Sequence, residues 1–116
     1  MPHVAVYGTL KQGCGNYRRF LASYRPIFQQ FVRIPFRMFA CDEYPTIVPS
    51  DGKHLIYVEV FEVDDATLAR LNRLEEPYNY RRETIYVREL GREVEIYVYA
   101  ERSPPAHFRP VVSGNW

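Results

Sequence analysis

Segments with the pattern of β-strands outnumber helical segments in this chain and do not alternate with them. The predicted strands cover 3–7, part of 27–41, 54–63, and a hairpin formed by 81–89 and 93–100. Amphipathic helices are predicted only over 16–24 and 66–76. Because a doubly wound α/β fold needs strands and helices in alternation, this order favours an α+β fold with a mixed or antiparallel sheet.

Proline and glycine show where these segments are interrupted. The stretch 27–41 contains Pro35, which predicts either two strands or one bent edge strand. The segment 44–49 is bracketed by prolines and is expected to be extended, with a turn at 50–52. Pro77 is expected to end the second helix, because proline cannot continue a helical hydrogen-bond ladder.

Length and composition limit the class of protein. A chain of 116 residues is expected to form one domain, 1–116, with one core. Ten tyrosines and seven phenylalanines suit a sheet curled around a pocket. The formal net charge of +1 supplies no field that would recruit nucleic acid or an anionic membrane, so we expect a small-molecule partner. The oligomeric state stays open, with a monomer favoured. No segment approaches the apolar length of a membrane span, and none is expected.

Cysteine and histidine indicate neither a disulfide framework nor a metal site. Cys14 and Cys41 are the only cysteines, and we expect both to be reduced thiols in a cytoplasmic protein. The three histidines are scattered along the chain without ligand spacing, so no metal site is predicted.

The stretch VAVYGTLKQGCGN at 4–16 predicts a strand that ends in a glycine-containing loop before a helix. Gly8 and Gly13 have the spacing of a phosphate-binding loop, but Cys14 and Gly15 stand where that loop needs Lys and Ser or Thr. Main-chain N–H groups at a strand end can still bind a carboxylate without a lysine. A tight turn before a helix explains the glycines equally well.

Glu75 lies near the end of the second predicted helix. At about 100° per residue, it falls only about 40° from the centre of the face formed by Leu68, Leu71 and Leu74, whereas Glu76 falls about 140° away. A carboxylate that points inward at a helix C-terminus has a raised pKa, because both desolvation and the helix dipole favour its protonated form. A general acid or base at neutral pH requires such a pKa. The alternative is an ion pair with Arg81 or Arg82, close by in the sequence.

Five motifs occur in order along nearly the whole chain. They are V-x-V-Y-G-T-L-K-x-G at 4–13, Y-P-x-x-V at 44–48, E-V-F at 59–61, L-x-x-L-E at 71–75 and Y-x-R at 80–82. Together they resemble the γ-glutamylcyclotransferase-like superfamily, which includes the γ-glutamylamine cyclotransferases and the avirulence-induced-gene-like proteins. The closing S-G-N-W resembles small prokaryotic members. The fold that this resemblance implies is a small mixed β-barrel flanked by short helices.

The resemblance also implies an activity and a site. Enzymes of the family cyclise a γ-glutamyl group, which releases 5-oxoproline and a free amine without a cofactor. Glu75 matches their catalytic acid and base. The positions that match substrate-binding residues are Tyr7, Gly8, Thr9 and Leu10 in the loop, with Tyr80 as a hydrogen-bond partner of the catalytic carboxylate and Tyr99 in the cavity.

The sequence therefore predicts a γ-glutamyl cyclotransferase-like enzyme whose partner is a small γ-glutamyl amine or peptide. The alternative is a non-catalytic module that keeps the pocket for a small ligand or a protein. Glu75 favours the enzyme, because a binding module has no need of an inward carboxylate that costs stability.

Overall fold

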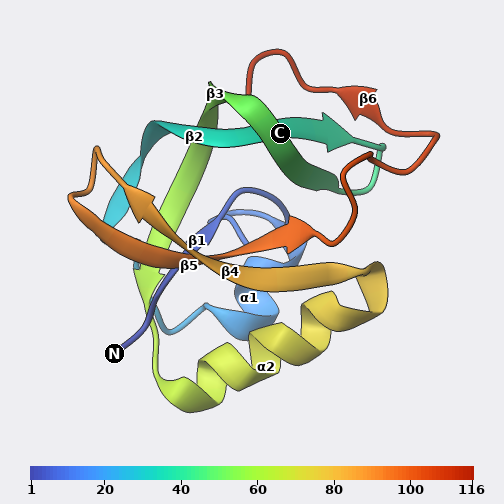
Figure 1. Ribbon diagram of the computed structural model, residues 1–116. Coiled ribbons are helices and arrows are strands. Elements are labelled where there is room, and N and C mark those ends of the chain that lie inside the picture. The colour runs from blue at the N-terminus through green and yellow to red at the C-terminus, as the bar shows by residue number, and fades with distance from the viewer.

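The computed structural model describes all 116 residues and contains a six-stranded mixed sheet that curls into a half-barrel (Figure 1). The strands are β1 (His3–Val6), β2 (Phe28–Ala40), β3 (Pro45–Glu62), β4 (Tyr80–Val87), β5 (Arg92–Tyr99) and β6 (Arg109–Pro110). Their order in the sheet is β4-β5-β1-β3-β2-β6. Only β1 and β5 pair in parallel, so the predicted α+β barrel with a mixed sheet is confirmed.

Two α-helices and one 3₁₀ turn accompany the sheet. They are α1 (Gly15–Phe20), α2 (Asp65–Glu75) and η1 (Glu76–Tyr78). Helix α1 ends four residues earlier than the pattern predicts. The carboxylate of Asp64 accepts a 2.7 Å hydrogen bond from the Thr67 N–H and thereby caps α2. None of the helices is long and apolar enough to cross a membrane.

Helix α2 ends at Glu75, two residues before Pro77, and the chain continues as the 3₁₀ turn η1. Pro77 sits in the first turn of η1, where a missing N–H costs nothing, and η1 continues directly from the helix. Asn79 then adopts the left-handed conformation, with φ of 63°, and leads the chain into β4. This compact connection brings the end of α2 close to the start of β4.

The stretch 27–41 forms one strand rather than two, with an irregularity at Pro35. Residues 36–40 pair with 45–49, and residues 28–34 pair with 54–60. Residues 50–53 are therefore left without partners opposite Pro35, which has no N–H to donate. The predicted turn at 50–52 is wrong, because these residues belong to β3 and form an enlarged bulge in its pairing with β2.

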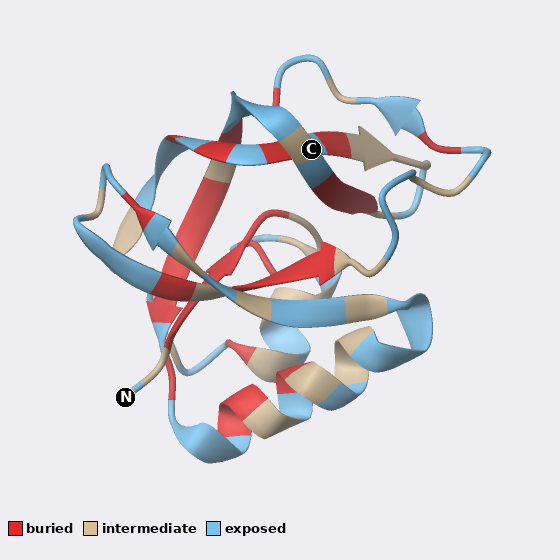
Figure 2. Cartoon of the chain, viewed as in Figure 1, coloured by how far each residue is buried: buried red, intermediate tan, exposed pale blue.

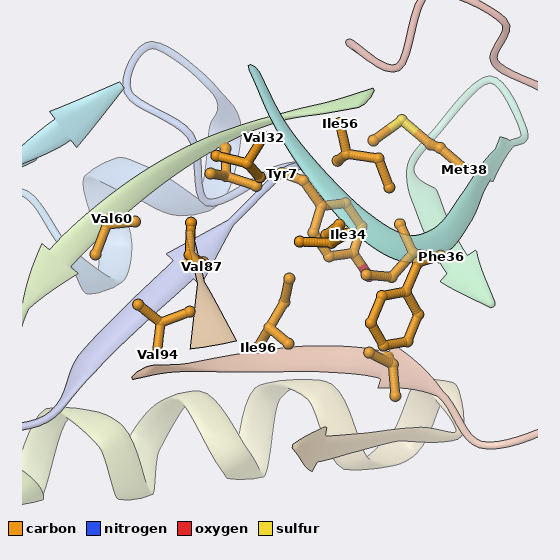
Figure 3. Close-up of a cluster of buried hydrophobic side chains, with 14 residues drawn as sticks. Tyr7, Val32, Ile34, Phe36, Met38, Ile56, Val60, Val87, Val94 and Ile96 are labelled. Carbon is orange, nitrogen blue, oxygen red and sulfur yellow. The ribbon is translucent and has the colours of Figure 1, made fainter. Parts of the chain in front are cut away.

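The core is divided into two clusters by the alternation of side chains along the strands. Ile56, Val58 and Val60 point into the cluster enclosed by the curled sheet (Figure 3), whereas Phe61 packs in a second cluster under the helices. Leu68 and Leu71 bury the inner face of α2 in that second cluster, and Figure 2 shows exposed residues on its outer face.

Candidate active site

A cavity of about 220 Å³ forms where the end of α2 meets the loop after β1 and the loop between β2 and β3. Its lining comes from segments far apart in the sequence: 5–10 and 16, 43–45, 74–75, 78, 80 and 97. Predicted residues Tyr7, Gly8, Thr9, Leu10, Glu75 and Tyr80 all line it. The structure therefore places the glycine loop and the helix-terminal glutamate in one cavity.

The loop after β1 lines this cavity with residues whose main-chain N–H groups have no acceptor in the protein. The Thr9 carbonyl accepts from the Asn16 and Tyr17 N–H groups at 2.9 and 3.2 Å, and the Asn16 amide donates to Thr9 Oγ1 at 2.8 Å. These bonds hold the loop against the start of α1. The N–H groups of Gly8, Thr9 and Leu10 donate to no protein atom. They are free to bind an anionic or carbonyl oxygen.

The loop glycines have separate structural reasons. A Cβ at Gly8 would lie 2.8 and 2.9 Å from the ring carbons Cγ and Cδ of Pro45, so Gly8 is required by the close approach of that proline. Gly13 has φ of 89°, a conformation that other residues rarely adopt. Gly15 has open space around its Cα and a negative φ. Gly8 is thus the glycine that shapes the cavity wall.

Two buried residues of opposite charge hold the loop from behind. Glu59, in β3, accepts a 2.6 Å hydrogen bond from the Gln12 N–H. The Lys11 ammonium donates to the side-chain oxygen of Asn115 at 2.9 Å and to the main-chain oxygen of Trp116. The Glu59 carboxylate is therefore a structural acceptor that fixes the back of the loop.

Glu75 points into the cavity and has no hydrogen-bond partner or ion pair in the protein. Arg81 pairs with Glu83, and Arg82 pairs with Glu95, so neither arginine neutralises it. Burial raises the pKa of Glu75 from its ordinary value of 4.5 to about 7. The carboxyl group can therefore both accept and donate a proton near neutral pH.

Tyrosine hydroxyls surround Glu75 but bond to the main chain rather than to the carboxylate. Tyr7 donates to the Tyr97 carbonyl at 2.7 Å, and Tyr80 donates to the Pro45 carbonyl at 2.6 Å. Burial, reinforced by the nearby Glu75 charge, raises the pKa of both hydroxyls, which therefore stay protonated. Tyr80 thus differs from the expectation that it hydrogen-bonds the catalytic carboxylate.

Tyr99 lies outside this cavity. Its side chain lines a neighbouring cavity and packs edge-to-face on Tyr80, with the ring centroids 6.3 Å apart. Tyr80 lines both cavities, so Tyr99 reaches the Glu75 region only through another ring.

Several lining residues were not predicted as site residues: Glu43, Tyr44, Leu74, Tyr78 and Tyr97. Tyr44 is the first residue of the Y-P motif, and its position there was the one available sign. The alternation of side chains along β5 does not distinguish Tyr97 from a core residue in the sequence. Leu74 and Tyr78 lie in α2 and η1, next to Glu75 in the sequence, whereas Tyr97 reaches the cavity through the arrangement of the sheet, which no local pattern encodes.

The two cysteines are free thiols outside the lining of this cavity. Cys14 precedes α1 as its N-cap residue but makes no side-chain capping bond. No group of three or more His, Cys, Asp or Glu side chains is arranged to hold a metal ion.

The curled mixed sheet, the glycine loop and the glutamate at the end of α2 define a protein of the γ-glutamylcyclotransferase-like fold. Comparison with known families makes the assignment more specific. The chain belongs to the family described as gamma-glutamyl cyclotransferase, AIG2-like, whose model matches residues 4–116. The predicted family is therefore confirmed.

Individual relatives agree with this assignment. A Methanocaldococcus jannaschii protein named "Putative gamma-glutamylcyclotransferase MJ1514" is 32% identical over 101 residues, which cover 85% of this chain and 83% of that protein. A Vibrio cholerae protein with the same family name is 37% identical over 84 residues, covering 71% of this chain and 70% of the relative. The crystal structure of an AIG2-like protein from Mus musculus is 28% identical, with a TM-score of 0.66, over 91% of this chain and 80% of the mouse chain.

Proposed function

We propose that this protein is a γ-glutamyl cyclotransferase that acts on small γ-glutamyl amines or peptides. One observation carries the proposal: an unpaired carboxyl group with a pKa raised to about 7 shares a cavity with three unpaired main-chain N–H groups. This combination offers a proton shuttle at neutral pH beside a cradle for oxygen atoms. The family assignment supports the same reaction class.

Glu75 is the proposed general base and acid. It takes a proton from the substrate α-ammonium, and the free amine then attacks the γ-carbonyl carbon of the same glutamyl unit. The new C–N bond closes the five-membered ring of 5-oxoproline as the bond to the leaving nitrogen breaks. The two protons that the attacking nitrogen sheds end on the leaving amine, with Glu75 as the relay.

The N–H groups of Gly8, Thr9 and Leu10 are the proposed cradle. They would bind the α-carboxylate of the glutamyl unit or the oxyanion that develops on the γ-carbonyl oxygen. Because the Thr9 carbonyl is tied to α1, the donors are preorganised and need little rearrangement when the substrate binds.

The chemistry requires no cofactor. The nucleophile belongs to the substrate, so holding the glutamyl unit in a folded conformation removes most of the entropic barrier to attack. The buried tyrosines contribute fixed, uncharged walls. Tyr7 and Tyr80 keep their protons engaged with carbonyl groups and leave Glu75 as the group in the cavity that exchanges a proton near neutral pH.

The direct test is to incubate the protein with a panel of γ-glutamyl amines and to measure 5-oxoproline by mass spectrometry. We expect Glu75→Gln to lower kcat at least about 100-fold, the usual contribution of one general base. Glu76→Gln is the matched control, because that neighbouring carboxylate is exposed and lies outside the cavity. Its activity should equal that of the wild type.

Equal product from the wild type and Glu75→Gln would remove Glu75 from the mechanism. If no γ-glutamyl amine is turned over but the panel still binds, the chain is a binding module that keeps the family pocket.

A further inference from the structure

A second cavity of about 280 Å³ adjoins the one that contains Glu75. The two share the side chains of Tyr44, Tyr78 and Tyr80, which form the wall between them. The loop before β6 contributes Pro105, His107 and Phe108 to the lining of the second cavity. Tyr78 in this wall is 50% exposed, so a molecule whose reacting group lies beside Glu75 would reach this space over the solvent side of the shared tyrosines.

Aromatic rings dominate the lining of the second cavity. Tyr44 packs edge-to-face against Phe108 and against Tyr78, with ring centroids 5.4 Å apart in both pairs. Tyr99 packs on Tyr80 in the same manner. No lysine, arginine, aspartate or glutamate lines this cavity. Its chemistry thus differs from that of the first cavity, which contains Glu43 and Glu75.

The wall of the second cavity also holds a buried hydroxyl without a hydrogen bond. Thr46 is 1% exposed, and its Oγ1 atom has no partner. It lies beside the hydroxyls of Tyr7 and Tyr80, which donate their own protons to main-chain carbonyls.

The proposed reaction needs such a second space. The glutamyl unit must lie against Glu75 and the loop N–H groups, while the leaving amine is bonded to the carbonyl carbon under attack. The substituent on that amine must therefore extend out of the first cavity. The space beyond Tyr44, Tyr78 and Tyr80 is lined for an apolar group rather than for a charged one.

We propose that the second cavity binds the leaving-amine arm and that the preferred substrates are γ-glutamyl amides of uncharged aromatic amines. This inference rests on the proposed function. An aromatic arm gains edge-to-face contacts with Tyr44, Tyr99 and Phe108. An ammonium on the arm would lose its hydration without meeting an opposite charge, and a carboxylate would meet only the ring of His107.

The test compares kcat/KM for three substrates that differ only in the arm: γ-glutamyl methylamide, γ-glutamyl phenethylamide and γ-glutamyl-ε-lysine. The methylamide needs the first cavity alone. We expect the phenethylamide to exceed the methylamide by about tenfold, the factor that well-packed aromatic contacts supply. The lysine derivative, whose arm is charged, should fall below the phenethylamide.

Phe108→Leu tests the cavity itself, because it removes one ring and keeps an apolar side chain. The ratio of phenethylamide to methylamide turnover should fall to about threefold or less, since one aromatic contact is lost. This ratio does not depend on how much of the variant folds. Tyr86→Leu is the matched control, because Tyr86 is exposed on β4 outside both cavities, and its ratio should match the wild type.

The outcomes separate the two proposals. In one outcome the methylamide is turned over, and Glu75→Gln abolishes this turnover, but the phenethylamide is not preferred or the lysine derivative is preferred. This outcome overturns the aromatic-arm inference and leaves the cyclotransferase proposal intact. No 5-oxoproline from any of the three substrates overturns both.

Discussion

At the scale of single residues, the proton affinity of Glu75 is set by its surroundings rather than by a charged partner. Desolvation is the cause of its raised pKa, and the two arginines considered as partners from the sequence, Arg81 and Arg82, pair with other carboxylates. The pKa of Glu75 is therefore set by the position of the end of α2 in the fold. Its neighbour Glu76 differs by one position and is exposed.

The rate should depend on pH through Glu75. Because the carboxylate form is the base, kcat/KM for γ-glutamyl methylamide should rise with pH on an acid limb whose apparent pKa is about 7. The profile is measured from initial rates of 5-oxoproline formation across that range. An acid limb near 4.5 would mean that Glu75 is solvated in the working enzyme.

Gly8→Ala should damage the cavity wall. The added methyl group would overlap the ring of Pro45, so the loop or the proline must shift, at a cost of about 1–3 kcal/mol in unfolding free energy. Activity should fall as the N–H groups move. Gly15→Ala is the control, because its Cβ meets nothing within 4 Å, and urea denaturation should show no loss of stability.

At the scale of elements, the loop after β1 is positioned by β3 from behind and by α1 in front. Glu59 near the end of β3 accepts from the Gln12 N–H, and the Thr9 carbonyl accepts from the first residues of α1. The sheet therefore contributes to the site in two ways: Pro45, Tyr80 and Tyr97 line the cavity directly, and Glu59 fixes the loop from behind.

Glu59→Ala should loosen this loop. Removing a buried acceptor leaves the Gln12 N–H unpaired and should lower the unfolding free energy by about 1–3 kcal/mol. KM should rise more than kcat falls, because the cradle is less well positioned. In Glu59→Gln, the amide oxygen can still accept, so that variant should retain most of the stability and a KM near the wild-type value. Equal losses in both variants would show that the charge, not the hydrogen bond, matters.

At the scale of the whole molecule, the site carries a cost in stability that depends on pH. The pKa of Glu75 is raised on folding, so the folded state binds the proton more tightly than the unfolded state. Its stabilising contribution is complete below about 4.5 and is lost as the pH rises through about 7. Above that range, folding must bury a carboxylate.

Glu75→Gln should therefore be more stable than the wild type at alkaline pH. The difference should reach up to about 3 kcal/mol above pH 7 and vanish in mild acid, where both side chains are neutral. Urea denaturation at several pH values measures it. A constant difference across pH would show that the substitution acts through packing instead of through titration.

The fold class follows from the order of strand and helix patterns, and the faces of β3 and α2 follow from their periodicity. The enlarged bulge of β3 at 50–53 was not predictable, since it depends on Pro35 in the paired strand β2. The inward direction of Glu75, in contrast, was predictable from the pattern of α2, because it is a local property of a helix with leucines on one face.

The sequence by itself determined the motifs, the family resemblance and the inward direction of Glu75. Only the tertiary structure decided that Tyr97 joins the cavity, that Tyr99 lies in the next one, and that Tyr80 donates to Pro45. The reason is physical: periodicity specifies which face of its own element a side chain occupies. Which distant side chains share a cavity depends on how the sheet curls and how the strands are ordered, which only the packing of the whole chain sets.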